Sequence, residues 1–352
     1  MKIINIGLIG YGAAGQIFHE PIITSVPGLN LSKIYETNDL NLKILKTKYP
    51  QDKITSNIED IFSDKSIEVV VLAVPNTAHY VLAKKALESG KNVVVEKPFT
   101  VTSEEADKLI KLAGEKNKIL TVHHNRRWDS DLRTIRKIVK ENLLGDLAEY
   151  EAHYDRFRNY IKENSWREND VPGSGILYDL GAHLIDQAQC LFGVPDEIFA
   201  DLQIQRSGGK TVDNFEIILH YPKVKVTLKA GMLVREAGPH FSLYGKNGSF
   251  IKYGMDVQEE ALKKGIIPKD TENWGVEPEN LWGKINTEVN GAHFIGKIES
   301  EAGDYREFYK NVYKAILGEE EIEVKAYQAR NTIKIIELAQ MSNKEKKWVK
   351  FE

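Results

Sequence analysis

The chain has 352 residues, more than one hydrophobic core usually serves, so we expect two domains. Its net charge of −3 gives no reason to expect binding to nucleic acid or an anionic membrane, and the single Cys190 excludes an internal disulfide framework and a cysteine-based zinc site. No apolar run reaches membrane-spanning length and no secretory signal pattern is present, so we expect a cytoplasmic protein.

Residues 1–125 alternate strand-like apolar runs with helical stretches, which predicts a doubly wound parallel sheet. The first strand, Lys2–Ile9, leads into Gly10-Tyr11-Gly12-Ala13-Ala14-Gly15 and then a helix. This spacing predicts a dinucleotide site: Gly10 permits the turn, Gly12 lets a pyrophosphate approach the backbone, and Gly15 lets the helix pack on the strand. Ala13 and Ala14 lie where the helix N-terminus offers its N–H groups to phosphates.

The second predicted strand, Leu31–Tyr35, ends at Glu36, about twenty residues past Gly15. An acid at this place can accept both ribose hydroxyls of NAD and repel the 2′-phosphate of NADP. We therefore expect NAD as the cofactor, with NADP left open. The alternative is an ordinary exposed glutamate at the end of a strand.

Later strands of this domain end in polar residues. Ligands of open α/β sheets bind beyond the carboxyl ends of the strands, so we expect these residues beside the nicotinamide. They are Pro75 and Asn76 after Ile67–Val74, Glu96 after Val93-Val94-Val95, and Asn125 after Ile119–His123. Asn76 is also expected to be the N-cap of the helix through Ser89.

Lys97 is the first candidate catalytic residue, because it follows a buried strand and precedes Pro98. The proline fixes its own φ and disfavours the α region at Lys97, which holds the lysine extended. A pocket at this edge could lower the pKa of a lysine. The alternative is a solvated lysine at a strand end.

Residues 126–352 follow a different pattern and are expected to form an α+β domain. A helix over Arg126–Asn142 and a long strand over Ala148–Arg158 come first, and strand-like segments near 196–206, 213–221, 224–234, 239–245 and 248–252 follow with short turns. Successive strands with short turns predict a large, mostly antiparallel sheet with helices on one face. Its open face would suit a subunit interface, so we expect a homodimer or homotetramer.

The helix from Gly175 to Phe192 carries a second chemical signal. Asp179 and His183 are four residues apart and share a helical face. A nearby acid raises the basicity of an imidazole and can fix its tautomer. A surface ion pair is the alternative, and no metal is expected, because no third ligand stands at a suitable local spacing.

Together these residues resemble the Gfo/Idh/MocA family of oxidoreductases. The likeness extends over essentially the whole chain and rests on the glycine motif, Glu96-Lys97-Pro98, and the run from Gly173 to His183. It implies a Rossmann domain followed by an open-sheet domain, in dimers or tetramers. Asp155-Arg156-Phe157-Arg158 and other segments are similar to the branch with NADP-dependent scyllo-inositol dehydrogenases, although NADP users tend to have small or basic residues where Glu36 stands.

The resemblance implies reversible hydride transfer between a nicotinamide and a secondary alcohol of an inositol-like polyol or sugar. His183 would be the base, Asp179 would orient it, and Lys97 would donate a hydrogen bond to the developing alkoxide. Residues expected to line the substrate pocket, unless they are ordinary surface residues, are Arg156, Arg158, Trp166 and Arg167. The alternative function is a non-catalytic NAD(P)-binding sugar sensor, since the yeast galactose co-repressor also resembles this family.

Overall fold

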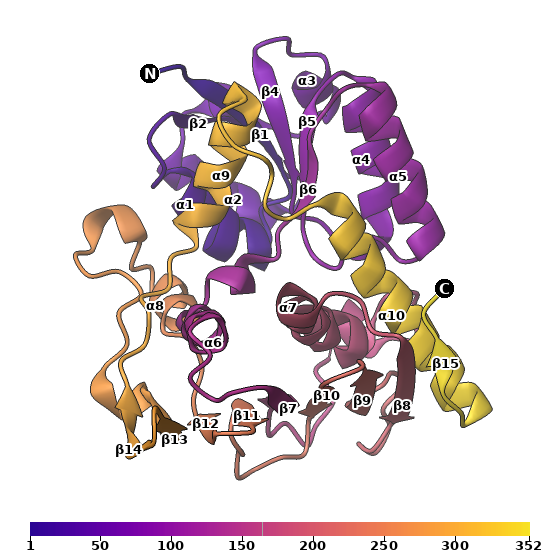
Figure 1. Ribbon diagram of the computed structural model, residues 1–352. Coiled ribbons are helices and arrows are strands. Elements are labelled where there is room, and N and C mark those ends of the chain that lie inside the picture. Colours follow the sequence, from indigo (N-terminus) through magenta and orange to yellow (C-terminus); the bar gives the residue numbers. More distant parts are fainter. Residues whose placement is uncertain (164) are drawn as a thin grey trace. The chain divides into compact units, whose positions relative to one another are not determined.

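The computed structural model describes residues 1–163 and 165–352, which form two compact units (Figure 1). The first unit contains residues 1–125 together with 258–274 and 304–330. The second contains residues 126–257, 275–303 and 331–352. Two segments that were expected in the second domain therefore belong to the first unit.

A six-stranded, all-parallel sheet forms the centre of the first unit, in the order β3-β2-β1-β4-β5-β6. Its strands are β1 (Ile4–Ile9), β2 (Leu29–Tyr35), β3 (Ile54–Thr55), β4 (Ile67–Leu72), β5 (Asn92–Val95) and β6 (Leu120–Val122). The central strands are almost wholly buried, as their β-branched runs predict. The order reverses between β1 and β4, where a doubly wound sheet opens a ligand crevice at its carboxyl edge. The Rossmann prediction is confirmed.

Helices cover both faces of this sheet, with α4 and α5 on one side and α1, α2 and α9 on the other (Figure 1). The helices of the unit are α1 (Glu20–Ile23), α2 (Asp39–Lys48), α3 (Glu59–Phe62), α4 (His79–Glu88), α5 (Ser103–Glu115), α8 (Gln258–Lys263) and α9 (Arg306–Leu317). Asn76 does not cap α4, contrary to the prediction. Pro75 turns the chain into a 3-10 turn, Asn76–Ala78, and Ala78 is the N-cap.

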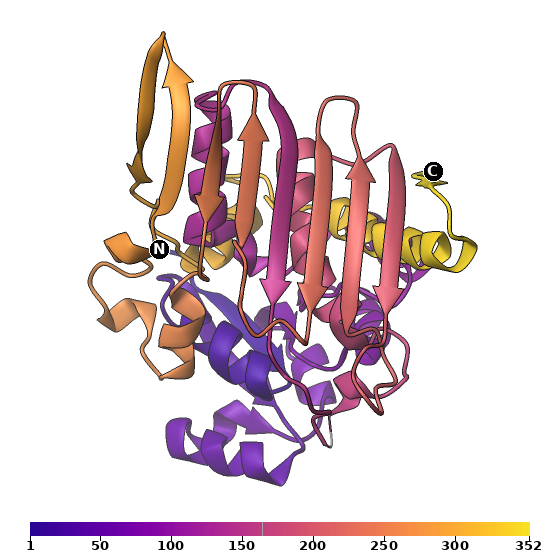
Figure 2. The same cartoon turned by 90° about the horizontal axis from the view of Figure 1, so that it is seen from below.

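A nine-stranded sheet forms the second unit, in the order β14-β13-β12-β11-β7-β10-β9-β8-β15 (Figure 2). Its strands are β7 (Leu147–Asp155), β8 (Glu197–Gln203), β9 (Asn214–His220), β10 (Lys225–Gly231), β11 (Phe241–Gly245), β12 (Gly248–Lys252), β13 (Gly283–Val289), β14 (Ala292–Ile298) and β15 (Val349–Lys350). β7 and β10 pair in parallel and the other pairs are antiparallel. The mostly antiparallel sheet is confirmed.

One face of the large sheet packs on helices and the other stays open. The helices are α6 (Ser130–Lys140), α7 (Ala182–Phe192) and α10 (Ala326–Glu345), which lie behind the sheet in Figure 2. Along β7 the buried side chains are Tyr150, Ala152 and Tyr154, and those between them are partly exposed. No helix in the described ranges has the length and apolarity to span a membrane.

Candidate functional site

The glycine loop after β1 has one glycine that the protein's own packing does not require. A Cβ on Gly10, which has φ +96°, would lie 2.4 Å from the Ala73 carbonyl oxygen, and one on Gly15 would lie 2.5 Å from the Gly10 carbonyl oxygen. A Cβ on Gly12 would meet no atom within 4 Å. The open space above Gly12 therefore fits a ligand that must approach the backbone, as a pyrophosphate does in this motif.

The helix after the loop is irregular. Ala13 and Ala14 begin it, and the segment Gly15–His19 is π-helical, with the Glu20 N–H bonded to the Gly15 carbonyl oxygen. Pro21 follows and has no N–H to donate, which disfavours a regular helix through this point. The result places the imidazole of His19 fully inside the unit. π-Helical turns occur frequently at functional sites.

Glu36 is held by four donors of the protein itself. Its Oε2 accepts from the Tyr11 N–H at 2.9 Å and from Asn41 Nδ2 at 3.0 Å. Its Oε1 accepts from the N–H groups of Thr37 at 2.7 Å and Asn38 at 2.8 Å. Burial alone would raise the pKa of Glu36, but these hydrogen bonds outweigh it and lower the pKa. Glu36 therefore presents a fixed negative charge whose acceptor positions are already occupied.

The other predicted cofactor residues lie at the carboxyl edge of the parallel sheet, on neighbouring strands. Pro75 and Asn76 follow β4, Glu96 follows β5, and Asn125 follows β6. Asn76, Glu96 and Asn125 are buried, and Pro75 is exposed. Lys97 is partly exposed at the same edge, and its N–H donates to Glu96 Oε2 at 2.9 Å.

A cluster that the sequence analysis did not predict surrounds Glu96. His123 Nδ1 lies 2.7 Å and His19 Nε2 lies 3.0 Å from Glu96 Oε1, and the Tyr309 hydroxyl lies 2.6 Å from His19 Nδ1. Burial would raise the pKa of Glu96, but the hydrogen bonds from both histidines lower it well below its usual range. Burial, reinforced by His123, lowers the pKa of His19 to about 4. Glu96 is therefore an anion that two imidazoles face, and the ring of His19 is neutral near pH 7.

In the second unit, Asp179 lies between two of the predicted arginines. It sits in a π-helical segment, Leu177–Gly181, directly before α7, and His183 is buried in the first turn of α7. Arg156 Nη1 lies 4.0 Å from Asp179 Oδ2, and Arg167 Nε lies 3.6 Å from Asp179 Oδ1. The structure thus brings two guanidinium groups to the carboxylate one turn before the histidine.

The loop that carries Trp166 and Arg167 is anchored by a residue that the sequence analysis missed. Arg206 is buried and bonds to Glu168 Oε2 at 2.7 Å, Asp213 Oδ2 at 2.9 Å and the Tyr160 carbonyl oxygen at 2.8 Å. The Arg167 guanidinium stacks on the Trp166 ring at 4.8 Å. Glu168 and Asp213, which both bond to Arg206, lie far apart in the sequence, so spacing could not reveal this contact.

Two further aromatic contacts lie near His183. The Tyr154 and His183 ring centroids are 6.4 Å apart, and the Arg126 guanidinium lies over the Tyr154 ring at 5.5 Å. Arg158, the fourth predicted substrate residue, follows the end of β7, where its N–H bonds to the Met232 carbonyl oxygen at 2.8 Å. Arg158 is tied there by its backbone, while Arg156 and Arg167 are tied to Asp179 by their side chains.

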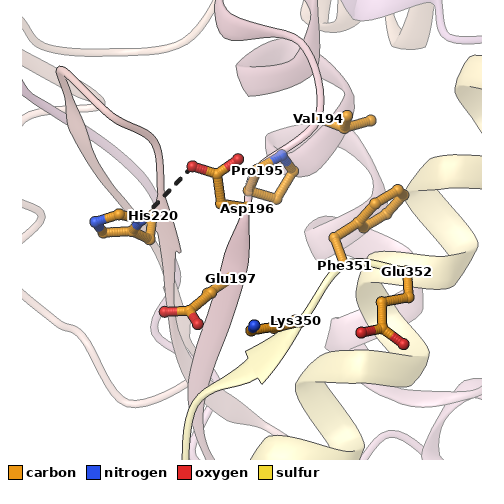
Figure 3. Close-up of a pocket in the computed structure, with 8 residues that line it drawn as sticks. All are labelled: Val194, Pro195, Asp196, Glu197, His220, Lys350, Phe351 and Glu352. Atoms are coloured by element: carbon orange, nitrogen blue, oxygen red, sulfur yellow. Dashed lines mark ion pairs between the residues drawn. The ribbon is translucent and has the colours of Figure 1, made fainter.

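A hollow lies at one end of the large sheet, where β15 pairs with β8 (Figure 3). It is lined by Val194, Pro195, Asp196, Glu197, His220, Lys350, Phe351 and Glu352. His220 Nδ1 lies 4.0 Å from Asp196 Oδ2 (Figure 3). Within the described chain, this lining includes none of the predicted cofactor, catalytic or substrate residues.

Sequence comparison matches residues 4–124 to the oxidoreductase family's NAD-binding Rossmann fold and residues 136–351 to its C-terminal alpha/beta domain. The chain belongs to the Gfo/Idh/MocA family. The family resemblance expected from the motifs is therefore confirmed over nearly the whole length. Oxidoreductase membership and a dinucleotide-binding Rossmann domain follow from it.

Relatives within the family align end to end with this chain. The scyllo-inositol 2-dehydrogenase (NADP(+)) IolW of Bacillus subtilis is 37% identical over 349 residues, which cover 99% of this chain and 96% of IolW. The uncharacterized oxidoreductase YdgJ of Escherichia coli is 40% identical over 337 residues, 95% of each chain. Among solved structures, YvaA of Bacillus subtilis has a TM-score of 0.95 at 36% identity and covers 100% of this chain and 99% of its own. An oxidoreductase structure from Bacteroides fragilis has a TM-score of 0.90 at 44% identity and covers 99% and 100%.

Proposed function

We propose that this Gfo/Idh/MocA protein is an NAD(P)-dependent dehydrogenase that acts on a secondary alcohol of an inositol-like polyol or sugar. The observation that carries the proposal is Asp179, bracketed by Arg156 and Arg167 and placed one turn before the buried His183. Guanidinium groups are good donors to oxygen-rich ligands, and an imidazole beside a carboxylate suits general acid–base catalysis. The name of IolW supports the choice of an inositol-like substrate.

The nicotinamide supplies a two-electron acceptor when it is bound. Oxidation of the alcohol breaks a C–H bond with loss of hydride and an O–H bond with loss of a proton. We assign the proton to the imidazole of His183, with Asp179 stabilising the resulting imidazolium. Lys97 would donate a hydrogen bond to the oxygen as negative charge develops on it. The ketone is the product, and the reverse reaction returns the same proton.

The cofactor is held in this proposal by the glycine loop and the strand ends. Gly10, Gly12 and Gly15, with the N–H groups near Ala13 and Ala14, would hold the pyrophosphate. Pro75, Asn76, Glu96 and Asn125 would border the nicotinamide half. NAD is the preferred cofactor in the proposal, because the fixed charge on Glu36 would repel a 2′-phosphate even though its oxygens already have partners. IolW is named for NADP, so both cofactors must be compared.

We also propose that the chain forms a homodimer or homotetramer through the open face of the nine-stranded sheet. The strands β7 and β9 alternate buried residues with partly or fully exposed ones, so a second copy could pack against the open face. Analytical ultracentrifugation gives the oligomeric state, and a charge reversal on this face, Glu149→Lys, should weaken association if the face is the interface.

The test of the activity is a panel of inositols and aldoses incubated with NAD and with NADP, read by fluorescence of the reduced cofactor. Turnover that depends on one stereochemical class of polyol supports the proposal. Saturable binding of cofactor and sugar without any turnover would refute it and favour a sensor.

A further inference from the structure

The first unit buries a polar cluster of which the proposed function uses only Glu96. His19 and Tyr309 are fully buried, and His123 and Glu96 are nearly so. A buried polar group is costly unless it is paired, and a paired network fixes the position of its members. The cluster lies directly behind Lys97, because Glu96 is the preceding residue and its Oε2 accepts the Lys97 N–H.

One assignment of protons gives each donor of the cluster a nearby acceptor, although the His19 N–H, 3.0 Å from Glu96 Oε1, is not aligned as a hydrogen bond. The Tyr309 O–H donates to His19 Nδ1, which leaves the proton of the neutral His19 ring on Nε2, facing Glu96 Oε1 at 3.0 Å. His123 donates from Nδ1 to the same oxygen at 2.7 Å. His123 Nε2 has no hydrogen-bond partner among the described residues and packs near Phe308, so a second proton there would be buried without an acceptor. Both imidazole N–H groups therefore face a single anion, Glu96, and Tyr309 donates to one of the two rings.

The four residues come from four separate parts of the first unit. Glu96 ends β5, His123 follows β6, His19 ends the π-helical segment behind the glycine loop, and Tyr309 belongs to α9. On the other side of Lys97, the Pro98 carbonyl oxygen lies 2.9 Å from Nδ1 of the buried His79. The backbone of Lys97 is thus fixed from both sides by buried groups.

We propose that Glu96, His123, His19 and Tyr309 are positioning residues that hold Lys97 in place and connect it to the helix behind the glycine loop. His123, His19 and Tyr309 act through Glu96, and Glu96 acts through the backbone of Lys97. The catalytic consequence rests on the proposed function, whereas the restraint on the Lys97 backbone does not. A misplaced catalytic group costs rate without a matching loss of binding.

A metal ion is the competing explanation, because two imidazoles and a carboxylate could ligate one. The distances favour protons. Each histidine nitrogen lies at hydrogen-bond distance from the same carboxylate oxygen, 2.7 Å and 3.0 Å, and Tyr309 completes the assignment without an ion.

The test is a matched pair of substitutions at His123. The amide of His123→Asn can place a donor where Nδ1 stands, and His123→Leu cannot. Hydrogen exchange followed by mass spectrometry reads the peptide over residues 93–99, which contains the Lys97 N–H. We expect exchange there to be faster by about tenfold or more in His123→Leu and near wild type in His123→Asn, since a lost restraint lowers local protection.

The kinetic arm uses the same variants with the substrate found in the panel. We expect His123→Leu to lower kcat about 10–100-fold with KM and cofactor Kd within about twofold, and His123→Asn to restore most of kcat. Tyr309→Phe, which removes only the hydroxyl, should act in the same direction more mildly, and it decides the matter if His123→Leu does not fold. If no substrate turns over, the proposed function fails, and the exchange result alone decides the positioning role.

Three outcomes would overturn the inference. One is wild-type exchange in His123→Leu. Another is faster exchange at residues 93–99 with unchanged kcat. The third is one equivalent of tightly bound transition metal in purified wild type that His123→Leu lacks.

Discussion

The buried imidazole of His19 makes a quantitative prediction about acid stability. Burial and the neighbouring His123 lower its pKa to about 4, against roughly 6.5 for histidine in an unfolded chain. Between pH 6.5 and about pH 4, His19 is protonated in the unfolded chain and neutral in the folded one. Falling pH therefore favours unfolding. The contribution of His19 to the free energy of unfolding is fully present above the pKa of the unfolded chain. It is lost as the pH falls toward the pKa of His19 in the folded chain.

The magnitude follows from linkage. A difference of about 2.5 pKa units corresponds to roughly 3 kcal/mol lost between pH 7 and pH 4, with a slope near pH 5 of about 1.2 kcal/mol per pH unit. In His19→Gln this term disappears from both states, so the free energy of unfolding should depend less on pH by about that slope. Tyr309→Phe keeps the imidazole and should keep most of the slope.

The assay is urea unfolding followed by tryptophan fluorescence and circular dichroism, at several values between about pH 7 and pH 4.5. The slope against pH is read, because the substitution also removes the bond to Tyr309 and lowers stability at every pH. Equal slopes in wild type and His19→Gln would show that His19 titrates alike in folded and unfolded chains, and the neutral assignment within the cluster would be wrong.

Three further predictions concern the site itself. Gly12→Val should fold with unchanged thermal stability and weaken cofactor binding at least about 100-fold in calorimetry, whereas Gly15→Val should destabilise the fold, because its Cβ has no space. Wild type should bind NAD more tightly than NADP by about 1–3 kcal/mol, and Glu36→Gln should narrow that gap by removing the charge; tighter NADP binding in wild type would contradict this. Lys97→Ala and His183→Ala should each lower turnover about 10²–10⁴-fold at unchanged cofactor affinity. The double variant should lose far less turnover than the product of the two single losses, because the two groups act as one unit. An active Lys97→Ala enzyme with an unchanged pH profile would place the site elsewhere.

The architecture of the first unit could be predicted from its sequence because its signals are local. The strands β4 and β5 are β-branched runs, and Thr102 and Glu105 form a capping box at the start of α5. The roles of Gly10 and Gly15 also follow from their spacing. After residue 252, β13, β14, β15 and the last three helices were not predicted, although Asn290-Gly291 between alternating segments is a hairpin signal.

The features of the site that could not be predicted depend on contacts between residues whose positions spacing alone does not give. Spacing identifies Glu36 as an acid at the end of β2, but it cannot show that backbone N–H groups of Tyr11, Thr37 and Asn38 point at that carboxylate. It cannot bring Tyr309 beside His19 either, since the pairing depends on how α9 packs. The irregular helices are hidden as well, because π-helical and α-helical segments share nearly the same apolar pattern.

The discontinuous make-up of the first unit has a consequence for the order in which it is completed during synthesis. Residues 304–330, which carry Tyr309 and the Val324 carbonyl oxygen that accepts from Thr121, belong to that unit. They leave the ribosome roughly 180 residues after Asn125, which at about 5–20 residues per second is a delay of roughly 10–40 s. During that interval His19 and Glu96 have emerged without their last partner. The side of the parallel sheet that α9 covers therefore stays uncovered until nearly the whole chain has been synthesised.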